Sequence, residues 1–105
     1  MTKQQIKQYK IRYELDNYIC QAEGCNNKAT QMAHRICRSK TNYSIYGKEI
    51  IDHNINIVSV CCVEHNDRYN IGNKTRIANK LAEYIRNNKD KRIPSKKVQK
   101  YIENC

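Results

Sequence analysis

Two pairs of potential metal ligands most constrain how this chain can fold. Cys20 and Cys25 form the first pair, and Cys61 and His65 form the second pair much further along the sequence. Each pair falls at an expected turn or strand end, and two such pairs of thiolate and imidazole donors make a closed tetrahedral zinc site. The spacing therefore predicts a structural Zn²⁺ that joins two distant parts of the chain.

The remaining cysteines leave alternatives open. Cys62 competes with Cys61, because spacing alone lets either thiol act together with His65. If a strand precedes them, adjacent side chains point to opposite faces and only one of the two thiols faces the metal. Cys37 and Cys105 have no partner at ligand spacing and are interpreted as a small core residue and a tail residue. Free buried thiols are the competing interpretation of all of them.

The composition explains why a metal is needed. The chain has 105 residues, enough for one domain, and contains no Trp and no Phe, so its core depends on aliphatic residues and eight Tyr. No stretch is apolar enough to span a bilayer, and the Lys- and Gln-rich start lacks the apolar centre of a signal peptide. We therefore expect a soluble cytoplasmic protein without membrane contact, in which metal binding is favoured over disulfides.

The charge favours a polyanionic partner. Lys and Arg number 20 against 10 Asp and Glu, which gives a net charge of +10 and makes nucleic acid the first candidate. Codon bias in an AT-rich bacterial, phage or viral genome is the competing explanation, because Lys, Asn, Ile and Tyr are all abundant. Basic residues concentrate between positions 74 and 100, where Lys74, Arg76 and Lys80 are candidate phosphate contacts and a solvated helix surface is the alternative.

The chain predicts helices at both ends and strands in the middle. Ile6, Tyr9 and Tyr13 recur at roughly helical spacing, so residues 3–18 predict an amphipathic helix that packs on the core. The other expected elements are strands over residues 29–37 and 55–62, a structured loop between them, and helices over residues 64–70, 74–88 and from Ser95 onward.

Three polar residues lie within the frame of the ligand pairs. His34 stands in the sequence AHRI, Asn56 lies five residues before Cys61, and Asn66 directly follows His65. With these residues in this order, residues 20–74 resemble the HNH endonucleases, the ββα-metal nucleases.

The resemblance implies an α+β fold in a single domain over residues 1–105. The zinc-stapled ββα core would occupy residues 20–74, an N-terminal helix would occupy residues 1–19, and basic helices would occupy residues 75–105. The implied activity is that of a metal-dependent DNA endonuclease or nickase. His34 would be the general base, and Asn56 would hold the strand that carries it. Asn66 would bind a catalytic Mg²⁺ or Mn²⁺ separate from the zinc.

One position departs from the family pattern. Many HNH members have an acidic residue or a second His before the base, whereas this chain has Ala33. Either His34 binds the cation itself, or the cation takes fewer protein ligands, with help from Asp67 or Asn70. The second arrangement is preferred because His34 keeps its place three residues before Cys37, where members often have Pro. The departure also allows a catalytically silent, zinc-stapled DNA-binding module.

Residues around the expected site have weaker assignments. Arg35, Arg38 and Lys40 flank it and are expected to hold phosphates, with a solvated surface as the alternative. Asp52 and His53 imitate the missing acidic-His pair but fall in the connecting loop. They are interpreted as a decoy, although His53 could still approach the phosphate.

The expected partner is DNA, double-stranded in the first instance, and a homodimer is left open. A zinc-finger adaptor that binds proteins is the last of the competing functions, because it leaves His34, Asn56 and Asn66 as coincidences. Tyr43 and Tyr46 are assigned to loop packing, with stacking on a nucleic-acid base as the alternative.

Overall fold

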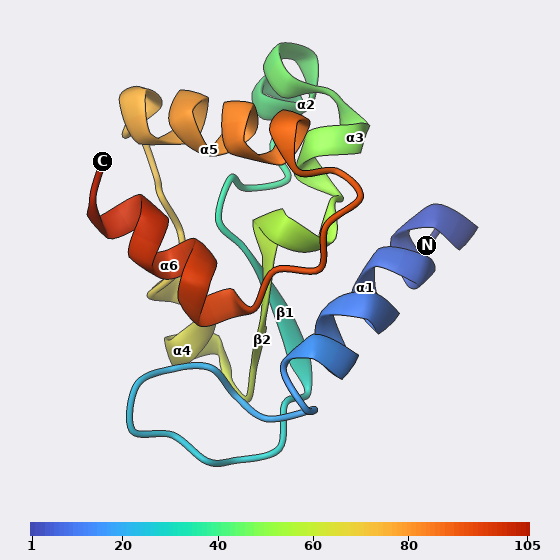
Figure 1. The fold of residues 1–105 in the computed structure, drawn as a ribbon, viewed down its shortest axis with the longest axis vertical. Helices are drawn as coiled ribbons and strands as arrows, with labels where there is room; N and C mark the ends of the chain where they lie inside the picture. Colours follow the sequence, from blue (N-terminus) through green and yellow to red (C-terminus); the bar gives the residue numbers. More distant parts are fainter.

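An antiparallel pair of short strands lies at the centre of the fold (Figure 1). In the computed structural model, which describes residues 1–105, β1 (Gln31–His34) pairs with β2 (Ile57–Val60). Helix α4 (Val63–Asp67) directly follows β2. The chain therefore has the small α+β organisation expected from the sequence, with one two-stranded antiparallel sheet and six α-helices.

The other elements surround this pair of strands. Helices α2, α3 and α5 lie at one end of the strand pair, and α4 and the loop before β1 lie at the other end (Figure 1). Helices α1 and α6 lie on opposite sides of the pair (Figure 1). These elements are α1 (Lys3–Leu15), α2 (Lys40–Tyr46), α3 (Lys48–Ile51), the 3-10 turn η1 (Asn54–Asn56), α5 (Thr75–Asn87) and α6 (Ser95–Glu103). No helix is both long and apolar enough to cross a membrane.

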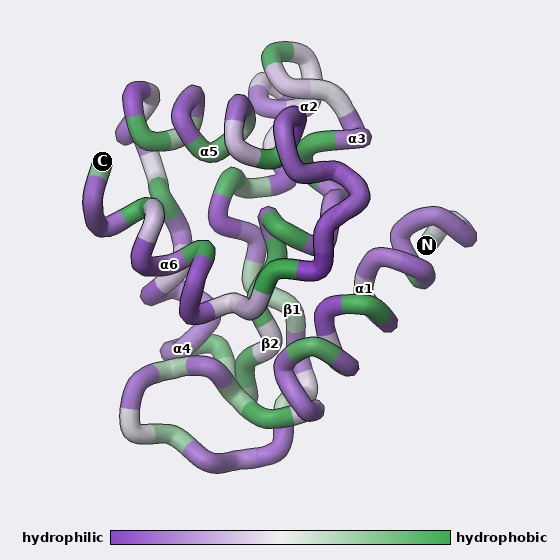
Figure 2. Tube along the Cα trace, in the orientation of Figure 1, coloured by the Kyte–Doolittle hydropathy of each residue, from purple (hydrophilic) through white to green (hydrophobic).

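Two separate apolar clusters form the interior. The larger contains 11 buried residues, and Figure 2 shows that α5 turns its hydrophobic side towards the centre of the molecule. Its members are Ile36, Ile50, Ile51, Ile55, Ile71, Ala78, Leu81, Ala82, Ile85, Ile93 and Val98. The smaller contains only five, namely Cys20, Ala22, Ala33, Val58 and Val60. Because a cluster of this size removes little apolar surface from water, the region around α4 needs another source of stability.

The helices near the C-terminus follow the sequence pattern closely. Helix α5 was expected over residues 74–88 and occupies Thr75–Asn87, burying Leu81, Ala82 and Ile85. The sequence favours Ser95 as the N-cap of α6, but Ser95 is the first residue of the helix and Pro94 takes the N-cap position. The Ser95 hydroxyl instead donates a hydrogen bond to Asp16, 2.8 Å away.

Helix α1 packs differently from the sequence prediction. The expected apolar stripe is wrong, because Ile6 is 53% exposed while Gln8 and Arg12 are buried. The Gln8 side chain accepts a hydrogen bond from the backbone N–H of Asn54, and Arg12 Nε donates to the carbonyl of Asn54. A polar face therefore holds this helix to the turn before β2.

The buried charge of Arg12 is paired. Arg12 forms an ion pair with Asp16 at 3.4 Å, and Asp16 also accepts hydrogen bonds from the Ser59 backbone and from Ser95. Because a buried charge is tolerated only when it is paired and hydrogen-bonded, this network fixes α1 against both β2 and α6.

The strands are shorter than the sequence predicted. Residues 29–37 and 55–62 were expected to be extended, but the strands cover Gln31–His34 and Ile57–Val60. The polar residues before β2 account for part of this difference. Nδ1 of His53 accepts a hydrogen bond from the N–H of Ile55 and caps the 3-10 turn η1, which takes the place of the expected start of the strand.

Candidate metal centre and candidate active site

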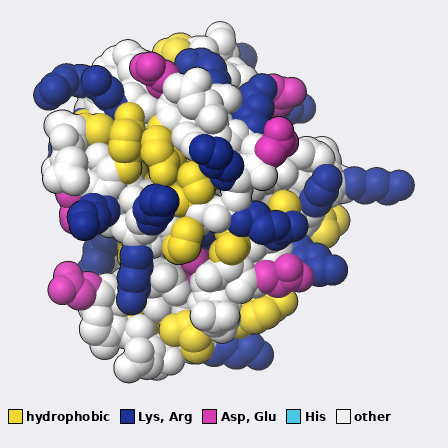
Figure 3. All heavy atoms as spheres, in the orientation of Figure 1, with side chains coloured by type: hydrophobic (Ala, Val, Ile, Leu, Met, Phe, Trp, Pro, Cys, Tyr) yellow, Lys and Arg dark blue, Asp and Glu magenta, His cyan; other side chains and the backbone are white.

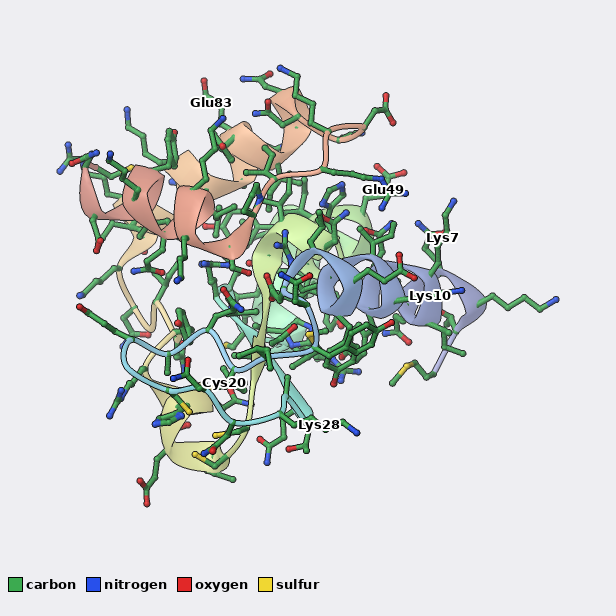
Figure 4. All side chains as sticks on the ribbon, turned by 60° about the horizontal axis from the view of Figure 1, so that its bottom comes forward. Lys7, Lys10, Cys20, Lys28, Glu49 and Glu83 are labelled. Atoms are coloured by element: carbon green, nitrogen blue, oxygen red, sulfur yellow. The ribbon has the colours of Figure 1, made fainter.

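The four expected metal ligands converge at one end of the molecule. Cys20 and Cys25 come from the loop between α1 and β1, Cys61 directly follows β2, and His65 lies in α4. Their ligand atoms all lie within 4.8 Å of one another. In Figure 4, where Cys20 is labelled, sulfur atoms gather beside α4. The loop can turn back between its cysteines because Gly24 takes a left-handed conformation, with φ of +78°.

The distances in this cluster suit a tetrahedral metal. Sγ of Cys25 lies 3.7 Å from Sγ of Cys61, and Nδ1 of His65 lies 3.4 Å from the Sγ atoms of both Cys20 and Cys61. Zinc–ligand bond lengths predict about 3.8 Å between two sulfur ligands and about 3.6 Å between sulfur and nitrogen. The Cys₃His group can therefore hold a metal ion such as zinc.

The surroundings of the thiols also fit a metal centre. The side-chain amide of Asn27 lies 3.7 Å from Sγ of Cys61. A hydrogen bond from the backbone N–H of Asn27 lowers the pKa of Cys25. Burial raises the pKa of Cys61 to about 12, so this thiol ionises readily only with a cation beside it. The competing ligand Cys62 lies outside the group, at the N-cap of α4. Cys37 and Cys105 are also outside the group.

Asn56 ties two segments together. Its side chain is completely buried and makes three hydrogen bonds to backbone groups. It accepts from the N–H of Ile36 at 2.9 Å and donates to the carbonyls of Ile36 and Ile51, at 3.0 and 2.8 Å. These bonds hold the chain just after β1 against the end of α3.

His34 is the last residue of β1 and faces α1. Its ring centroid lies 6.1 Å from that of Tyr9, and its Nε2 atom is buried without a hydrogen-bond partner. Burial and the positive charge of Arg38 lower the pKa of His34 to about 4. The ring is therefore neutral at pH 7. Its Nε2 atom is unpaired and shielded from solvent.

A chain of hydrogen bonds lies near this histidine. Nε of Arg38 donates to the Tyr43 hydroxyl at 3.2 Å, and that hydroxyl donates to Asp52 at 3.0 Å. Gln5 of α1 donates to the other carboxylate oxygen of Asp52 at 3.2 Å. Tyr43 thus has the packing role expected from the sequence, and so has Tyr46, which also packs against the larger core cluster.

Asn66 lies at the other end of β1. Its amide nitrogen is 3.4 Å from both the side-chain oxygen of Gln31 and the carbonyl of Met32. Since side chains alternate along a strand, Gln31 and His34 point to opposite faces. The structure therefore brings Asn66 beside Gln31 and forms no hydrogen bond between Asn66 and His34. The Asn66 carbonyl oxygen accepts no hydrogen bond from the protein and is free to bind a cation.

The position before His34 contributes no ligand. Ala33 is completely buried in the smaller apolar cluster, opposite Val58 on β2. Of the two residues expected to help, Asp67 is exposed, whereas the side-chain oxygen of Asn70 already accepts a hydrogen bond from Gly72. Of these two residues, Asp67 is therefore the better candidate to join Asn66 at a cation.

Two of the other assignments can be judged from burial. Arg35 was expected to hold phosphate, and this is wrong. It is 1% exposed, donates to the carbonyls of Ile55 and Ser95, and lies over the ring of Tyr69. His53 is also buried, with Nδ1 accepting from Ile55 and Nε2 bonded to the carbonyl of Lys89. Both its nitrogens are engaged, which agrees with the interpretation of Asp52 and His53 as a decoy.

The other candidate phosphate contacts are exposed. Arg38 follows β1 in the chain and Lys40 is the first residue of α2, whereas Lys74 caps α5 and Arg76 and Lys80 lie in its first half. Figure 3 shows Lys and Arg side chains spread over much of the face in view. All five side chains are therefore accessible at the surface. No family model, curated protein or solved structure matches the chain.

Proposed function

We propose that the protein is an HNH-type DNA endonuclease or nickase. In this proposal the Cys₃His group binds a structural zinc, and His34 is the general base for hydrolysis of a phosphodiester bond. The observation that carries the proposal is Asn56, whose buried amide fastens the segment just after His34 to the loop before β2. This is the positioning role that the HNH resemblance implies for an asparagine at this place.

His34 is the proposed base, and in the free protein its pKa of about 4 makes it a weak one. It is neutral at pH 7 because burial and Arg38 lower its pKa, and its Nε2 atom has no protein partner. A phosphodiester bound next to Arg38 would offset the positive charge and raise the pKa of His34, so the ring would accept a proton from water more readily.

Asn66 is the proposed cation ligand, together with Asp67 and oxygen atoms of the substrate. A bound Mg²⁺ or Mn²⁺ would stabilise the negative charge that develops on the phosphate and the leaving oxygen. The carbonyl of Asn66 suits such a hard cation, and its amide is already oriented by Gln31 and Met32. The base and the cation must act on one phosphate, whereas His34 and Asn66 lie at opposite ends and on opposite faces of β1. The Asn66→Ala variant therefore tests whether the cation binds there at all.

A silent DNA-binding module is the second candidate. Ala33 favours it, because the position that carries an acidic ligand or a second His in many HNH nucleases is here a methyl group packed in an apolar cluster. The basic surface and the metal centre would be retained in such a module, without turnover.

Relaxation of supercoiled plasmid separates the two candidates. We expect the zinc-loaded protein to nick or linearise the plasmid when Mg²⁺ or Mn²⁺ is present. The control omits these cations rather than adding a chelator, because a chelator would also remove the zinc. Plasmid binding without cleavage under any of these conditions would establish the silent module, and absence of both would exclude a function on duplex DNA.

Replacement of Asn66 tests the cation site. In Asn66→Ala we expect cleavage to need about 10-fold more Mg²⁺, and high Mg²⁺ to restore part of the rate, because one of few protein ligands is lost. Cleavage is measured as a function of Mg²⁺ concentration, with the exposed Asn73→Ala as control. An unchanged cation requirement in Asn66→Ala would place the cation elsewhere.

The salt dependence of DNA affinity tests the basic surface. Neutralising Lys74, Arg76 and Lys80 together should weaken binding to all sequences alike and reduce the salt slope by about 2 to 3 units for duplex DNA. The matched control neutralises three other exposed cations, Lys3, Lys7 and Lys48. An unchanged slope in the first variant would assign the start of α5 to solvent.

A further inference from the structure

Three tyrosines form a line that starts at His34. Tyr9 and Tyr13 lie one turn apart on α1, about 6 Å along the helix axis. The Tyr9 ring lies next to His34, and the Tyr13 ring is parallel to that of Tyr18, with centroids 6.0 Å apart and an interplanar angle of 3°. We call Tyr9, Tyr13 and Tyr18 the tyrosine ridge.

The outer end of the ridge is held in an unfavourable conformation. Asn17 and Tyr18 have φ values of +56° and +59°, in the left-handed region. Asn tolerates this region, but Tyr does so only at an energetic cost. Two backbone hydrogen bonds fix the conformation, from the Tyr18 N–H to the Tyr13 carbonyl at 2.9 Å and from the Ala29 N–H to the Tyr18 carbonyl at 2.8 Å.

Burial does not repay this strain. The Tyr18 side chain remains 49% exposed, so much of its ring faces solvent. Backbone strain is concentrated at active sites and ligand-binding sites, which makes this exposed ring a candidate contact for a ligand.

Positive charges lie near both ends of the ridge. Lys10 follows Tyr9 on α1, and Lys28 forms a β-bridge with Ile19, the residue after Tyr18. Both lysines are exposed, and Figure 4 labels them on the side of the molecule where α1 meets β1. Arg38 is close enough to Tyr9 and His34 for its positive charge to act on both, and so is the negatively charged Asp52. The exposed Glu14 follows Tyr13 on α1.

Aromatic rings flanked by cations are suited to a strand with unpaired bases. The rings can stack on exposed bases of any type, while the cations contact the phosphates between them. In an intact duplex the base faces are covered by neighbouring base pairs, so a ridge of this kind gives no advantage there.

We propose that the tyrosine ridge binds a single-stranded segment of DNA and leads its backbone to His34. The proposal rests on the proposed function for the role of His34. It adds that the substrate contains unpaired bases next to the bond that is cut. Its binding step needs no divalent cation and can be measured without cleavage.

Binding of zinc-loaded protein to a fluorescent oligothymidylate tests the ridge, with no Mg²⁺ or Mn²⁺ added. Tyr18→Gly removes the ring and relieves the left-handed strain, so its melting temperature should be at least that of the wild type. We expect its affinity for the single strand to fall by about 5- to 150-fold, while its affinity for duplex DNA changes by less than about 2-fold. Tyr18→Phe should bind normally, as should Ile6→Ala, which alters another exposed apolar residue of α1.

Three results would overturn the proposal. These are normal binding of oligothymidylate by Tyr18→Gly, equal losses for single strand and duplex, and tighter binding of the wild type to oligouridylate than to oligothymidylate. Plasmid relaxation by the same variants is measured separately. If Tyr18→Gly keeps both oligothymidylate binding and plasmid cleavage, the ridge proposal fails and the nuclease proposal stands. If the wild type binds the oligothymidylate but cuts nothing, the nuclease proposal fails and the ridge proposal is judged on binding alone.

Discussion

Removal of the metal should unfold the region around α4 and, with it, most of the protein. The smaller core cluster has only five buried residues, and the four ligands join the loop before β1 to β2 and α4. A structural zinc contributes about 10 to 16 kcal/mol of binding free energy, comparable with the entire stability of a typical domain. Circular dichroism of the zinc-loaded protein during titration with a strong chelator measures this loss.

Variants of the thiols separate the ligands from their neighbours. Cys25→Ser should contain less zinc and melt at a much lower temperature, whereas Cys62→Ser should retain one zinc per chain. Metal analysis of protein purified without chelator provides the stoichiometry. Less than half an equivalent of zinc in the wild type, or a fold that survives complete chelation, would contradict the assignment of a structural metal.

Replacement of Asn56 should have the second large effect. Asn56→Ala removes three hydrogen bonds and leaves backbone groups of Ile36 and Ile51 unsatisfied in the interior. Because each unsatisfied buried polar group costs roughly 1 to 3 kcal/mol, we expect the free energy of unfolding to fall by about 3 kcal/mol or more. Urea unfolding of the zinc-loaded protein measures this change.

The control for Asn56 is another asparagine. Asn66→Ala removes only two long contacts of a half-buried side chain and should cost less than about 1 kcal/mol. Cleavage by Asn56→Ala should also decline, because the segment after His34 loses its attachment to the loop. A loss of stability no larger than that of Asn66→Ala would show that Asn56 does not hold the two segments together.

Spacing and periodicity predicted the parts of the structure that depend on short-range pattern. The ligand set could be predicted because the donors of a tetrahedral metal must come in pairs on turns or strand ends. Helix α5 could be predicted because its aliphatic residues recur on one side, and they now line the larger core cluster.

The errors arose where polar contacts between residues far apart in the sequence determine which side chains are buried. The i,i+4 spacing of Arg12 and Asp16 allows them to pair, but nothing in the pattern of α1 shows that Arg12 would be buried against Asn54. The exposed Ile6 was therefore taken for a core residue. Arg35 follows His34 in the sequence and was assigned to phosphate. Its burial depends on carbonyls of Ile55 and Ser95, which come near only after folding.

The role of His34 is the central claim, and cleavage by His34→Ala tests it most directly. Zinc-loaded wild type and variant are compared on supercoiled plasmid with Mn²⁺, after zinc content and DNA affinity have been shown to match. Met32→Leu, on the same face of β1, is the control and should cut normally. We expect His34→Ala to lose at least about 100-fold in rate at every cation concentration, because a general base contributes to the transition state. Cleavage by His34→Ala at the wild-type rate would contradict the account.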